Sequence, residues 1–567
     1  MQAPPPTPRR RSALARYAPF LAVVVIIALV VVIVGGRDNK SKPKVKTANT
    51  AGGASTLPIT YNEAKAAGTL SKYKWGPHCD TTTGFVAIPV LHPAPCVPAF
   101  TGKNSGASAP GVTSDTINIV FYVPKPDPQF DILAKKVGAY DAPEQLIQGM
   151  KDYVAIFEKL HETYGRKIRL LFLHGTGLSA DSTAARADAI KAADELHAFA
   201  VVNGPTQTKA FSEELTSRGV MCVGLCLIAQ PQSFYAAHPG LFGVGPLPEQ
   251  PADATVELIA KQLKGKNAEY AGDPKFKSEP RRFALLTYDT LDSQFKPVWD
   301  RFKKKLNDAG IPLATHVSYF LNLATTQEDA RTIITKLKTS GATSVIFSGD
   351  PILPIYFTQE ATRQNYHPEW IISGTVFADT AVFARGFDQS QWAHAFGIGL
   401  VAAQTPEVEH DDYALHKWWF GTPPPNSNTT AIVAGDVDLL FTGLQLAGPD
   451  LTVQNFSAGL RDQAAPPESP NGLNAIYTYG QHGFWPGVDF GGLDNFNLIW
   501  WDPTTKGPDE TGNNGTGMYR YVDNARRFLP GHYPSSPIKF FDPTNTITRF
   551  TSTPPELQPK QYPKPKQ

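Results

Sequence analysis

The sequence lacks the short motifs that would assign it to a familiar enzyme class. It contains no G-x-S-x-G elbow, no H-E-x-x-H pair and no Walker loop for phosphate. The strings Gly243-Val244-Gly245 and Gly397-Ile398-Gly399 lack the third glycine of a dinucleotide fingerprint. Four of the histidines, His78, His92, His174 and His482, also lack the spacing to cysteine or aspartate that metal ligands show. We therefore expect no catalytic residues, no metal and no cofactor.

Strong charge of either sign is missing as well. The formal net charge is +2 over 567 residues. Non-specific binding of nucleic acid needs a large basic surface, so nucleic acid is not expected as a partner. Hydrophobic and aromatic contents of 42% and 11% are those of a folded protein. The length exceeds what one hydrophobic core accommodates, which predicts two lobes with appendages.

Cysteine is scarce, with only four residues in the chain. Cys79 and Cys96 flank a proline-rich loop without metal-type spacing, which predicts a disulfide between them. Cys222 and Cys226 follow an apolar run, and four residues of extended strand would separate them by roughly 13 Å, beyond disulfide reach. They can bridge only if the strand ends near Gly224. A second disulfide and two buried thiols both remain open.

Charged residues are absent from one long apolar run, residues 18–34, which approaches the ~20 residues that span a bilayer. It is either an uncleaved anchor or a signal peptide cut near Gly36. We favour the anchor, because the run exceeds the usual ~7–15-residue signal core and no A-x-A site follows. No cysteine stands at its end to carry a lipid. The paired cysteines downstream favour an extracytoplasmic body, since disulfides persist outside the reducing cytosol.

These features predict the outer parts of the chain. Residues 1–17 form a basic cytoplasmic arm, 18–36 a single-pass anchor in the cell membrane, and 37–110 a tether and a disulfide-strapped extension. At the other end, residues 551–567 are rich in proline and lysine and are expected to be disordered.

The body is organised around residues 199–230. An apolar strand, 199–202, breaks at Asn203, Gly204 and Pro205, a helix follows, and residues 220–225 form a second apolar strand. Two buried strands joined by one helix are expected to be parallel neighbours with a right-handed crossover. Loops at the carboxyl ends of such strands border a crevice, which places residues 203–208 there.

The same alternation recurs along the chain and predicts two doubly wound α/β lobes. Before the central unit come strands at 117–123 and 168–173 and helices at about 141–164 and 183–196, the former with a capping-box-like start at Asp141 and Glu144. The second series has strands at 283–286, 313–320, 344–347, 370–372 and 396–401, with helices between them. Helices at 436–446 and 451–460 have no strand between them and are expected to cover an existing sheet. Residues 466–550 are turn-rich and aromatic, and are expected to pack on the lobes.

Several strings resemble the type 1 periplasmic-binding-protein family, the leucine/isoleucine/valine-binding components of ABC importers. They are GVTSDTINIVFY (111–122), DSTAARADAIKAADELHAFAVVNGPTQT (181–208), FYAAHPGLFGVGPLPEQ (234–250) and LNDAGIP (306–312). The strings at 78–98 and 519–528 are similar to the extension and the ending of larger members. The resemblance covers residues 111 to about 527, although a membrane helix would here replace the usual lipid anchor or free state.

The resemblance implies two lobes joined by hinge strands that close on a small polar solute, an amino acid or a related organic molecule. Lobe 1 would comprise 111–251 with a return segment, 402–465, and lobe 2 would comprise 252–401. The partner would be an ABC transporter permease. An extracytoplasmic sensor with a separate signalling partner is the alternative, and a surface-anchored enzyme is less favoured.

Three residues of lobe 1 are candidates for ligand contact. Thr206 and Thr208 lie where a helix N-terminus offers free N–H groups to an anion. Gln230, after the next strand, offers an amide. The alternatives are that Thr208 is only an N-cap and that Gln230 is only solvated.

Four residues of lobe 2 follow strands whose loops the resemblance places beside the ligand. Tyr288 could cover an apolar group, and Asp289 or Asp350 could pair with an ammonium. Thr375 belongs to a third such loop. Capping is the common role of aspartate at a strand-to-helix junction, so Asp289 and Asp350 are alternatively loop-shaping residues.

Overall fold

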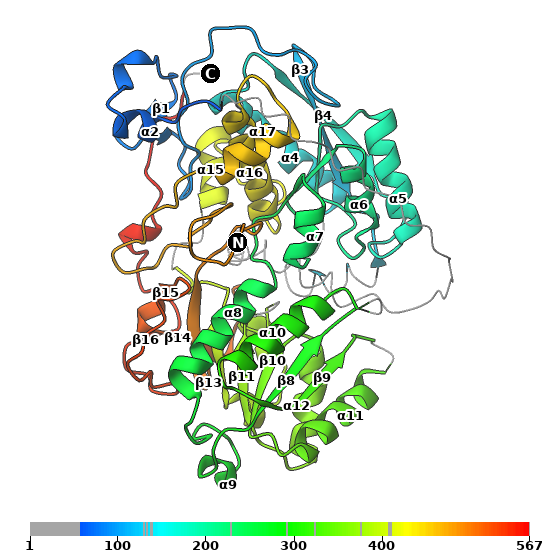
Figure 1. Ribbon diagram of the computed structural model, residues 1–567, viewed down its shortest axis with the longest axis vertical. Helices are drawn as coiled ribbons and strands as arrows, with labels where there is room; N and C mark the ends of the chain where they lie inside the picture. The colour runs from blue at the N-terminus through cyan, green and yellow to red at the C-terminus, as the bar shows by residue number, and fades with distance from the viewer. Residues whose placement is uncertain are drawn as a thin grey trace, which may run out of the picture.

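The computed structural model describes residues 57–128, 131, 134–135, 140–226, 230–290, 293–322, 325–374, 377–405 and 411–565. Within these residues the chain forms two α/β lobes, one above the other in Figure 1, with the N-terminal extension beside the upper lobe. The predicted α/β fold with parallel sheets is confirmed. The predicted anchor at residues 18–36 lies outside the described residues.

Lobe 1 contains a five-stranded parallel sheet with the strand order β4-β3-β5-β6-β7. Its strands have near-continuous apolar sequences because helices cover both faces. Val120 lies in register between Leu171 and Val201 at the centre of the sheet. The strands are β3 (Thr116–Val123), β4 (Lys167–His174), β5 (Ala200–Val202), β6 (Met221–Val223) and β7 (Leu241–Phe242).

The helices of lobe 1 come from two separate parts of the chain. The first part supplies α4 (Pro143–Leu160), α5 (Ser182–Ile190) continued by the π-helical turn η2 (Lys191–Glu195), α6 (Ala210–Ser217) and α7 (Gln232–Ala237). The second supplies α15 (Asp411–Phe420), α16 (Thr430–Ala447) and α17 (Val453–Arg461). Phe157 of α4 packs 6.0 Å from Phe441 of α16, ring centre to ring centre, so the return segment completes the core of lobe 1.

The start of α4 differs from the expected Asp141–Glu144 capping box. The N-cap is Ala142, and its N–H donates to the Gln145 side chain at 2.8 Å. The Asp141 carboxylate instead accepts from the N–H and the hydroxyl of Thr429, both at 2.8 Å. Asp141 therefore ties α4 to the start of α16, a contact between segments far apart in sequence.

Lobe 2 contains a mixed sheet with the main strand order β16-β14-β13-β12-β11-β10-β8-β9, and β15 also pairs with β13. The parallel strands are β8 (Phe283–Tyr288), β9 (Leu313–Tyr319), β10 (Ser344–Ser348), β11 (Glu369–Ser373) and β12 (Ala395–Gly399). The helices are α8 (Glu249–Leu258) continued by η3 (Ile259–Leu263), α9 (Pro274–Lys277), α10 (Lys296–Asp308), α11 (Thr326–Thr339), α12 (Leu353–Arg363), α13 (Ala381–Ala384) and α14 (Gln389–Trp392).

The antiparallel strands of lobe 2 correct the expectation for residues 466–550. This region was expected to be turn-rich, but it adds β13 (Phe496–Pro508), β14 (Asn514–Val522) and β15 (Arg527–Phe528) to the sheet, and β16 (Thr546–Ile547) follows. Side chains alternate across β13, so Trp500 and Trp501 enter the cores on opposite faces. The aromatic pair is thus a sheet element rather than a surface cluster.

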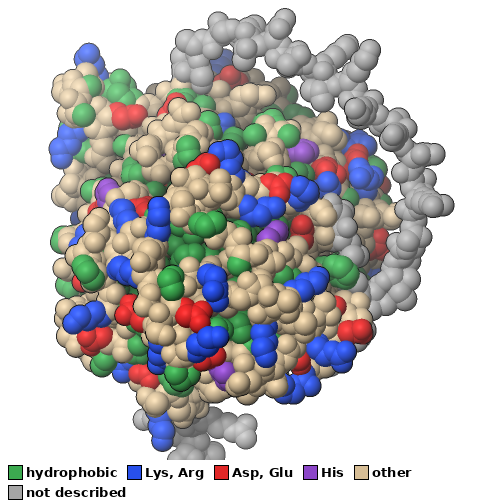
Figure 2. Space-filling view, turned by 60° about the horizontal axis from the view of Figure 1, so that its bottom comes forward, with side chains coloured by type: hydrophobic (Ala, Val, Ile, Leu, Met, Phe, Trp, Pro, Cys, Tyr) green, Lys and Arg blue, Asp and Glu red, His purple; other side chains and the backbone are tan. Residues whose placement is uncertain are grey.

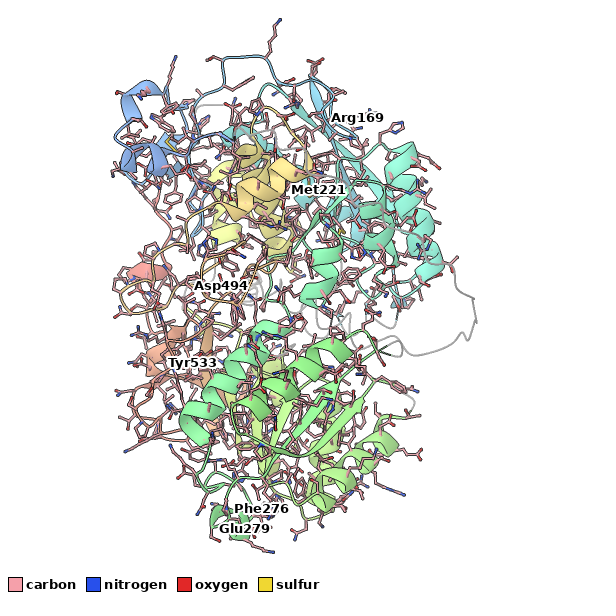
Figure 3. The ribbon with its side chains drawn as sticks, viewed as in Figure 1. Arg169, Met221, Phe276, Glu279, Asp494 and Tyr533 are labelled. Carbon is pink, nitrogen blue, oxygen red and sulfur yellow. A yellow bond between two sulfur atoms is a disulfide. The ribbon has the colours of Figure 1, made fainter. Side chains whose placement is uncertain are left out.

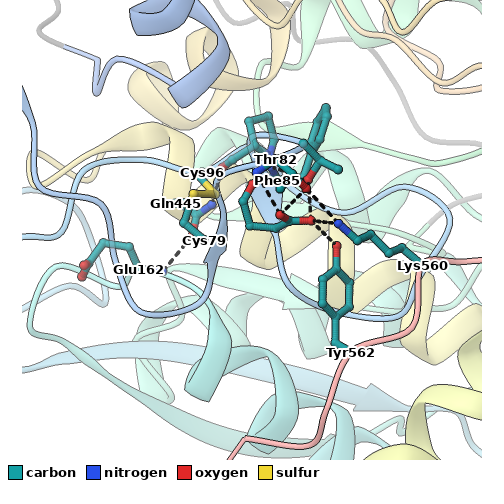
Figure 4. The surroundings of a disulfide bond; sticks show 11 residues. Cys79, Thr82, Phe85, Cys96, Glu162, Gln445, Lys560 and Tyr562 are labelled. Carbon is teal, nitrogen blue, oxygen red and sulfur yellow. Dashed lines mark hydrogen bonds and ion pairs between the residues drawn. A yellow bond between two sulfur atoms is a disulfide. The ribbon is translucent and has the colours of Figure 1, made fainter. Parts of the chain in front are cut away.

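The N-terminal extension packs on lobe 1 and includes α2 (Tyr61–Ala66), η1 (Leu70–Lys72), β1 (Cys79–Asp80) and β2 (Phe85–Val86). The predicted Cys79–Cys96 disulfide is confirmed. The Asp80 carboxylate accepts from Lys560 Nζ at 2.5 Å and from the Tyr562 hydroxyl at 2.9 Å. Figure 4 shows these two residues of the C-terminal segment close to Thr82 of the extension. Lys560 and Tyr562 therefore attach the C-terminal segment to the extension, and Glu556 accepts from Asn471, so residues 551–565 are not the disordered tail expected from their composition.

The surface charge and the hydropathy of one helix relate to two expectations from the sequence, which concern nucleic acid and the membrane. Figure 2 shows lysine and arginine interspersed with aspartate and glutamate on the face in view, without a broad basic area. Within the described ranges, α16 alone is long and apolar enough to cross a membrane by length and composition. It is 72% buried and serves as a core helix of lobe 1.

Candidate ligand-binding site

The carboxyl ends of the parallel strands in both lobes face the other lobe. Residues 243–248 lead from the end of β7 directly to the start of α8 in lobe 2. Because a helix that packs between parallel strands runs against them, the start of α8 lies at the carboxyl edge of the lobe 2 sheet. This short connection brings the two carboxyl edges together, and loops at these edges form the candidate site (Figure 1).

The loop after β5 has a backbone shape that few residues allow. Asn203 has a φ of 66°, and its side-chain amide donates to the Tyr122 carbonyl at 3.1 Å. A side chain at Gly204 would lie 2.7 Å from the Cys226 carbonyl oxygen, so only glycine permits this approach of the β5 and β6 loops. The Asn203-Gly204 pair therefore fixes the position of residues 205–208.

Two polar groups in this loop are buried without a protein partner. The Thr206 hydroxyl and the Gln207 side-chain oxygen make no hydrogen bond within the described residues, and Thr206 is only 2% exposed. Buried polar groups are nearly always paired, which makes these two candidates for pairing with a ligand. Thr208 differs, because its hydroxyl accepts from the Ala210 N–H at 3.2 Å and shapes the start of α6. The N-cap of α6 is Lys209, so Thr208 precedes the N-cap and is not itself the capping residue of the alternative interpretation.

The loop after β6 is constrained by a second disulfide, Cys222–Cys226. β6 ends at Val223 and Gly224 has a φ of 74°, which is the early strand end that this bridge requires. The Asp436 carboxylate of α16 accepts from the Leu225 N–H at 3.0 Å. Burial raises the pKa of Asp436 to about 7, against the stabilising effect of that hydrogen bond on the charged form.

Gln230 follows this constrained loop and is 4% exposed, so it is not the solvated side chain of the alternative interpretation. Its backbone N–H donates to the Tyr235 hydroxyl oxygen, which lowers the pKa of Tyr235, but burial outweighs this effect and raises that pKa to about 12. The structure therefore places Gln230 in the interior, between the β6 loop and α7.

On lobe 2, Asp350 is a buried loop-shaping residue. Its carboxylate accepts from the Tyr319 hydroxyl at 2.6 Å and from the N–H groups of Ile352 and Leu353 at 2.7 and 2.9 Å. Burial raises the pKa of Asp350. With both oxygens engaged and 1% exposure, the carboxylate supports the start of α12, as the capping alternative states.

Tyr288 and Asp289 lie at the end of β8, next to Tyr319. The Tyr288 ring is half-buried and its centre lies 6.1 Å from that of Tyr319. The Asp289 carboxylate accepts from the N–H groups of Thr290 and Phe295, at 2.8 and 3.1 Å, which orders the loop before α10. The structure thus brings Tyr288, Asp289 and Asp350 together around Tyr319. Thr375 lies outside the described residues.

Three segments connect the lobes, and two of them run side by side. The Tyr479 hydroxyl donates to the Gly243 carbonyl at 2.8 Å, and the Gly492 N–H donates to the Gly245 carbonyl at 3.1 Å. The remaining connection leaves β12, where the N–H groups of Leu400 and Val401 donate to Asp379 at 2.6 and 3.0 Å. Hydrogen bonds from the half-buried Tyr479 and to the buried Asp379 therefore hold the backbone at these connections.

Two carboxyl groups lie in the third connection, at the level between the lobes where Figure 3 labels Asp494. Asp489 accepts from the Gln250 amide at 3.0 Å, and Asp494 accepts from the Thr478 hydroxyl at 2.7 Å and the Trp485 N–H at 2.8 Å. Burial, together with the neighbouring Asp494 carboxyl, raises the pKa of Asp489 far above its ordinary value.

Sequence reasoning missed Gln207 and Asp436. Gln207 stands between two threonines that were singled out, so its signal was present but was not used. Asp436 is the first residue of a helix pattern, and its contact with Leu225 spans 211 positions, which no local pattern reveals. In the described part of the chain, no group of three or more His, Cys, Asp or Glu side chains is placed to hold a metal ion.

Two facing α/β lobes with paired connections define the class of two-lobed binding proteins. The sequence profile described as "periplasmic binding protein" matches residues 134–484, more than half of the chain. The chain therefore belongs to the periplasmic binding protein family. No curated protein matches it in sequence.

Several solved structures are similar to this chain. A solute-binding protein of an ABC transporter from R. palustris, in complex with 4-hydroxybenzoate, is 13% identical, with a TM-score of 0.47, and covers 74% of this chain and 99% of its own. A fatty acid ABC transporter substrate-binding protein from Thermomonospora curvata is 13% identical, with a TM-score of 0.47 and coverages of 75% and 95%. A putative branched-chain amino acid ABC transporter protein from Silicibacter pomeroyi is 12% identical, with a TM-score of 0.47 and coverages of 74% and 100%. Likeness at this level carries no information on what this chain binds.

Proposed function

We propose that this chain is an extracytoplasmic solute-binding protein that captures a small polar molecule between its lobes and delivers it to an ABC importer. Membership of the periplasmic binding protein family supports this proposal. The lobes would close around the ligand by bending at the three connections, driven by contacts that exist only in the closed state.

The observation that carries the proposal is that two buried polar groups in the loop after β5 have no hydrogen-bond partner within the described residues. The Thr206 hydroxyl can donate or accept, and the Gln207 oxygen accepts. A polar solute that pairs with both groups removes the free-energy penalty of leaving them buried and unpaired. On the facing lobe, the half-buried Tyr288 ring offers an apolar surface, and its hydroxyl can donate or accept.

The membrane part of the proposal rests on the sequence. The run at residues 18–34 would hold the protein at the outer face of the cell membrane, where the polar segment that follows it serves as a tether. An amino acid or a related organic solute is the ligand class that we propose, because it combines hydrogen-bonding groups with a small apolar part.

A thermal-shift screen of the full-length chain in detergent tests this function. Amino acids, short peptides, aromatic acids and sugars are added singly, and a ligand is expected to raise the melting temperature by an amount that grows with the ratio of its concentration to its Kd. The shift should shrink in the Thr206→Val variant and persist in the Tyr356→Phe variant, which alters a tyrosine on α12 instead. Turnover of an added compound, or equal shifts in wild type and Thr206→Val, would contradict the proposal.

A further inference from the structure

A cavity lies between the N-terminal extension and the end of α4, and none of its lining residues belongs to the loops of the candidate site. Its volume is about 80 Å³, which is room for several water-sized molecules. The Cys79–Cys96 disulfide forms part of its wall, next to Glu162 and Gln445 (Figure 4). The remaining lining residues are Gly76, Pro77, His78, Val86, Val97, Ala99, Leu160 and His161.

His161 supplies an acceptor that nothing in the described structure uses. The Nδ1 atom of His161 lies 3.0 Å from the Phe157 carbonyl oxygen. A carbonyl only accepts, so this bond places the proton on Nδ1 and leaves a lone pair on Nε2. Nε2 is buried and has no hydrogen-bond partner among the described residues. Burial lowers the pKa of His161 to about 4, so the ring is neutral near pH 7.

The neighbouring polar groups also present acceptors. Glu162 accepts from the N–H groups of Phe100 and Tyr164 at 3.1 and 2.8 Å, and it forms no ion pair with any residue in the described ranges. The Gln445 amide is already used, because its oxygen accepts from the Glu162 N–H and its nitrogen donates to the Pro95 carbonyl. Burial lowers the pKa of His78, so this ring is also neutral. The unused capacity is therefore the imidazole lone pair of His161, in a cavity that the acidic residue Glu162 also lines.

We propose that this cavity is a second binding site, which takes a small primary ammonium carrying a short apolar chain. The ammonium would donate to His161 Nε2 and face the Glu162 carboxylate, while Val86, Val97 and Leu160 contact the chain. Lys159 is exposed and lies near enough to His78 to lower its pKa. The positive charge of Lys159 repels a bound cation and attracts a bound anion. Removing this charge should therefore tighten the binding of a cation and weaken the binding of an anion.

Propylammonium chloride serves as the probe, with propanol and propionate as neutral and anionic analogues. The full-length chain, labelled at the histidine rings, is titrated and followed by NMR. Propylammonium is expected to shift the His161 ring signals saturably, and propanol and propionate are not. Saturable shifts at other histidine rings but not at His161, or saturable binding of propionate but not propylammonium, would overturn the proposal.

Variants assign the binding to this cavity. His161→Phe should weaken propylammonium binding by roughly tenfold or more, since a hydrogen bond to a charged group is lost. His238→Phe is the matched control, because His238 also bonds the carbonyl four residues earlier, at 2.8 Å, but lies outside the cavity. Lys159→Gln, an exposed change, should tighten binding. Unchanged affinity in His161→Phe, or weaker binding in Lys159→Gln, would contradict the proposal, whereas loss of binding in Thr206→Val alone would bear only on the proposed solute site.

Discussion

At the residue scale, Thr206 combines a cost in stability with a role in binding. Its hydroxyl is buried and unpaired in the described structure, which costs about 1–3 kcal/mol of folding free energy. Thr206→Val keeps the shape and removes the hydroxyl. We therefore expect the variant to be more stable than wild type by about 1 kcal/mol in chemical denaturation, and to bind the solute about tenfold more weakly.

Thr208→Val is the control for this prediction, because the two threonines stand two positions apart in one loop. It removes the bond from the Ala210 N–H and should lower stability by about 1 kcal/mol. A loss of stability in both variants would show that the Thr206 hydroxyl has a partner after all.

Asp436 makes stability depend on pH. Its folded-state pKa of about 7 lies above the ordinary value near 3.8, so the folded protein holds this proton more tightly than the unfolded chain. Its contribution is fully present below pH ~4, declines as the pH rises from about 4 to about 7, and changes little above that. The Asp436→Asn side chain stays neutral at every pH. The stability of this variant relative to wild type should therefore increase by about 1.4 kcal/mol per pH unit between pH ~4 and pH ~7.

Chemical denaturation of both proteins at pH 5 and pH 8 checks the Asp436 prediction. The stability difference between variant and wild type should move in favour of Asp436→Asn at pH 8. The same difference at both values would show that Asp436 has an ordinary pKa in the folded protein.

At the element scale, the two disulfides close loops of different length. Cys79 and Cys96 are 17 positions apart and Cys222 and Cys226 only four. The loop-entropy relation gives about 3 kcal/mol for the first bridge and about 2 kcal/mol for the second. Replacing Cys79 and Cys96 by alanine should therefore destabilise the protein more than replacing Cys222 and Cys226, as measured by urea denaturation. The reverse order would mean that local contacts, such as those of Asp436, dominate over chain entropy.

Element prediction worked where the hydrophobic period was undisturbed. The strands around Val120 and Ile346 and the helix containing Phe302 were all located from their patterns, because each is apolar on the side that meets a core. β13 was missed because its pattern is interrupted. Pro503 lies where the register with β14 shifts, between Asp502 and Lys506. A bulge accommodates proline in a strand, but proline in a sequence argues against a strand.

The candidate site was only partly predictable for a related reason. Strand ends could be located, so the loops carrying Thr206, Tyr288 and Asp350 were identified as edge loops. Whether a polar residue faces a ligand or caps a helix depends on contacts distant in sequence. Asp350 follows β10 and reaches Tyr319 of β9 across the intervening strand β8, and no local pattern distinguishes that role from ligand contact.

At the scale of the whole molecule, two lobes built on separate cores are joined by three connections. Such lobes can move as units, because few segments cross between them and their cores are largely separate, although Ala134 and Tyr140 of lobe 1 pack against the core of lobe 2. The account requires that ligand binding changes the distance between the lobes while each lobe keeps its own structure.

Spin labels measure this movement directly. Ala187→Cys on α5 and Thr332→Cys on α11 place exposed labels on the two lobes, and the four native cysteines are all bridged. A compound that raises the melting temperature should shorten the distance between these labels, whereas labels at Ala187→Cys and Lys151→Cys, both in lobe 1, should keep theirs. Binding without any change in the distance between the lobes would contradict the account.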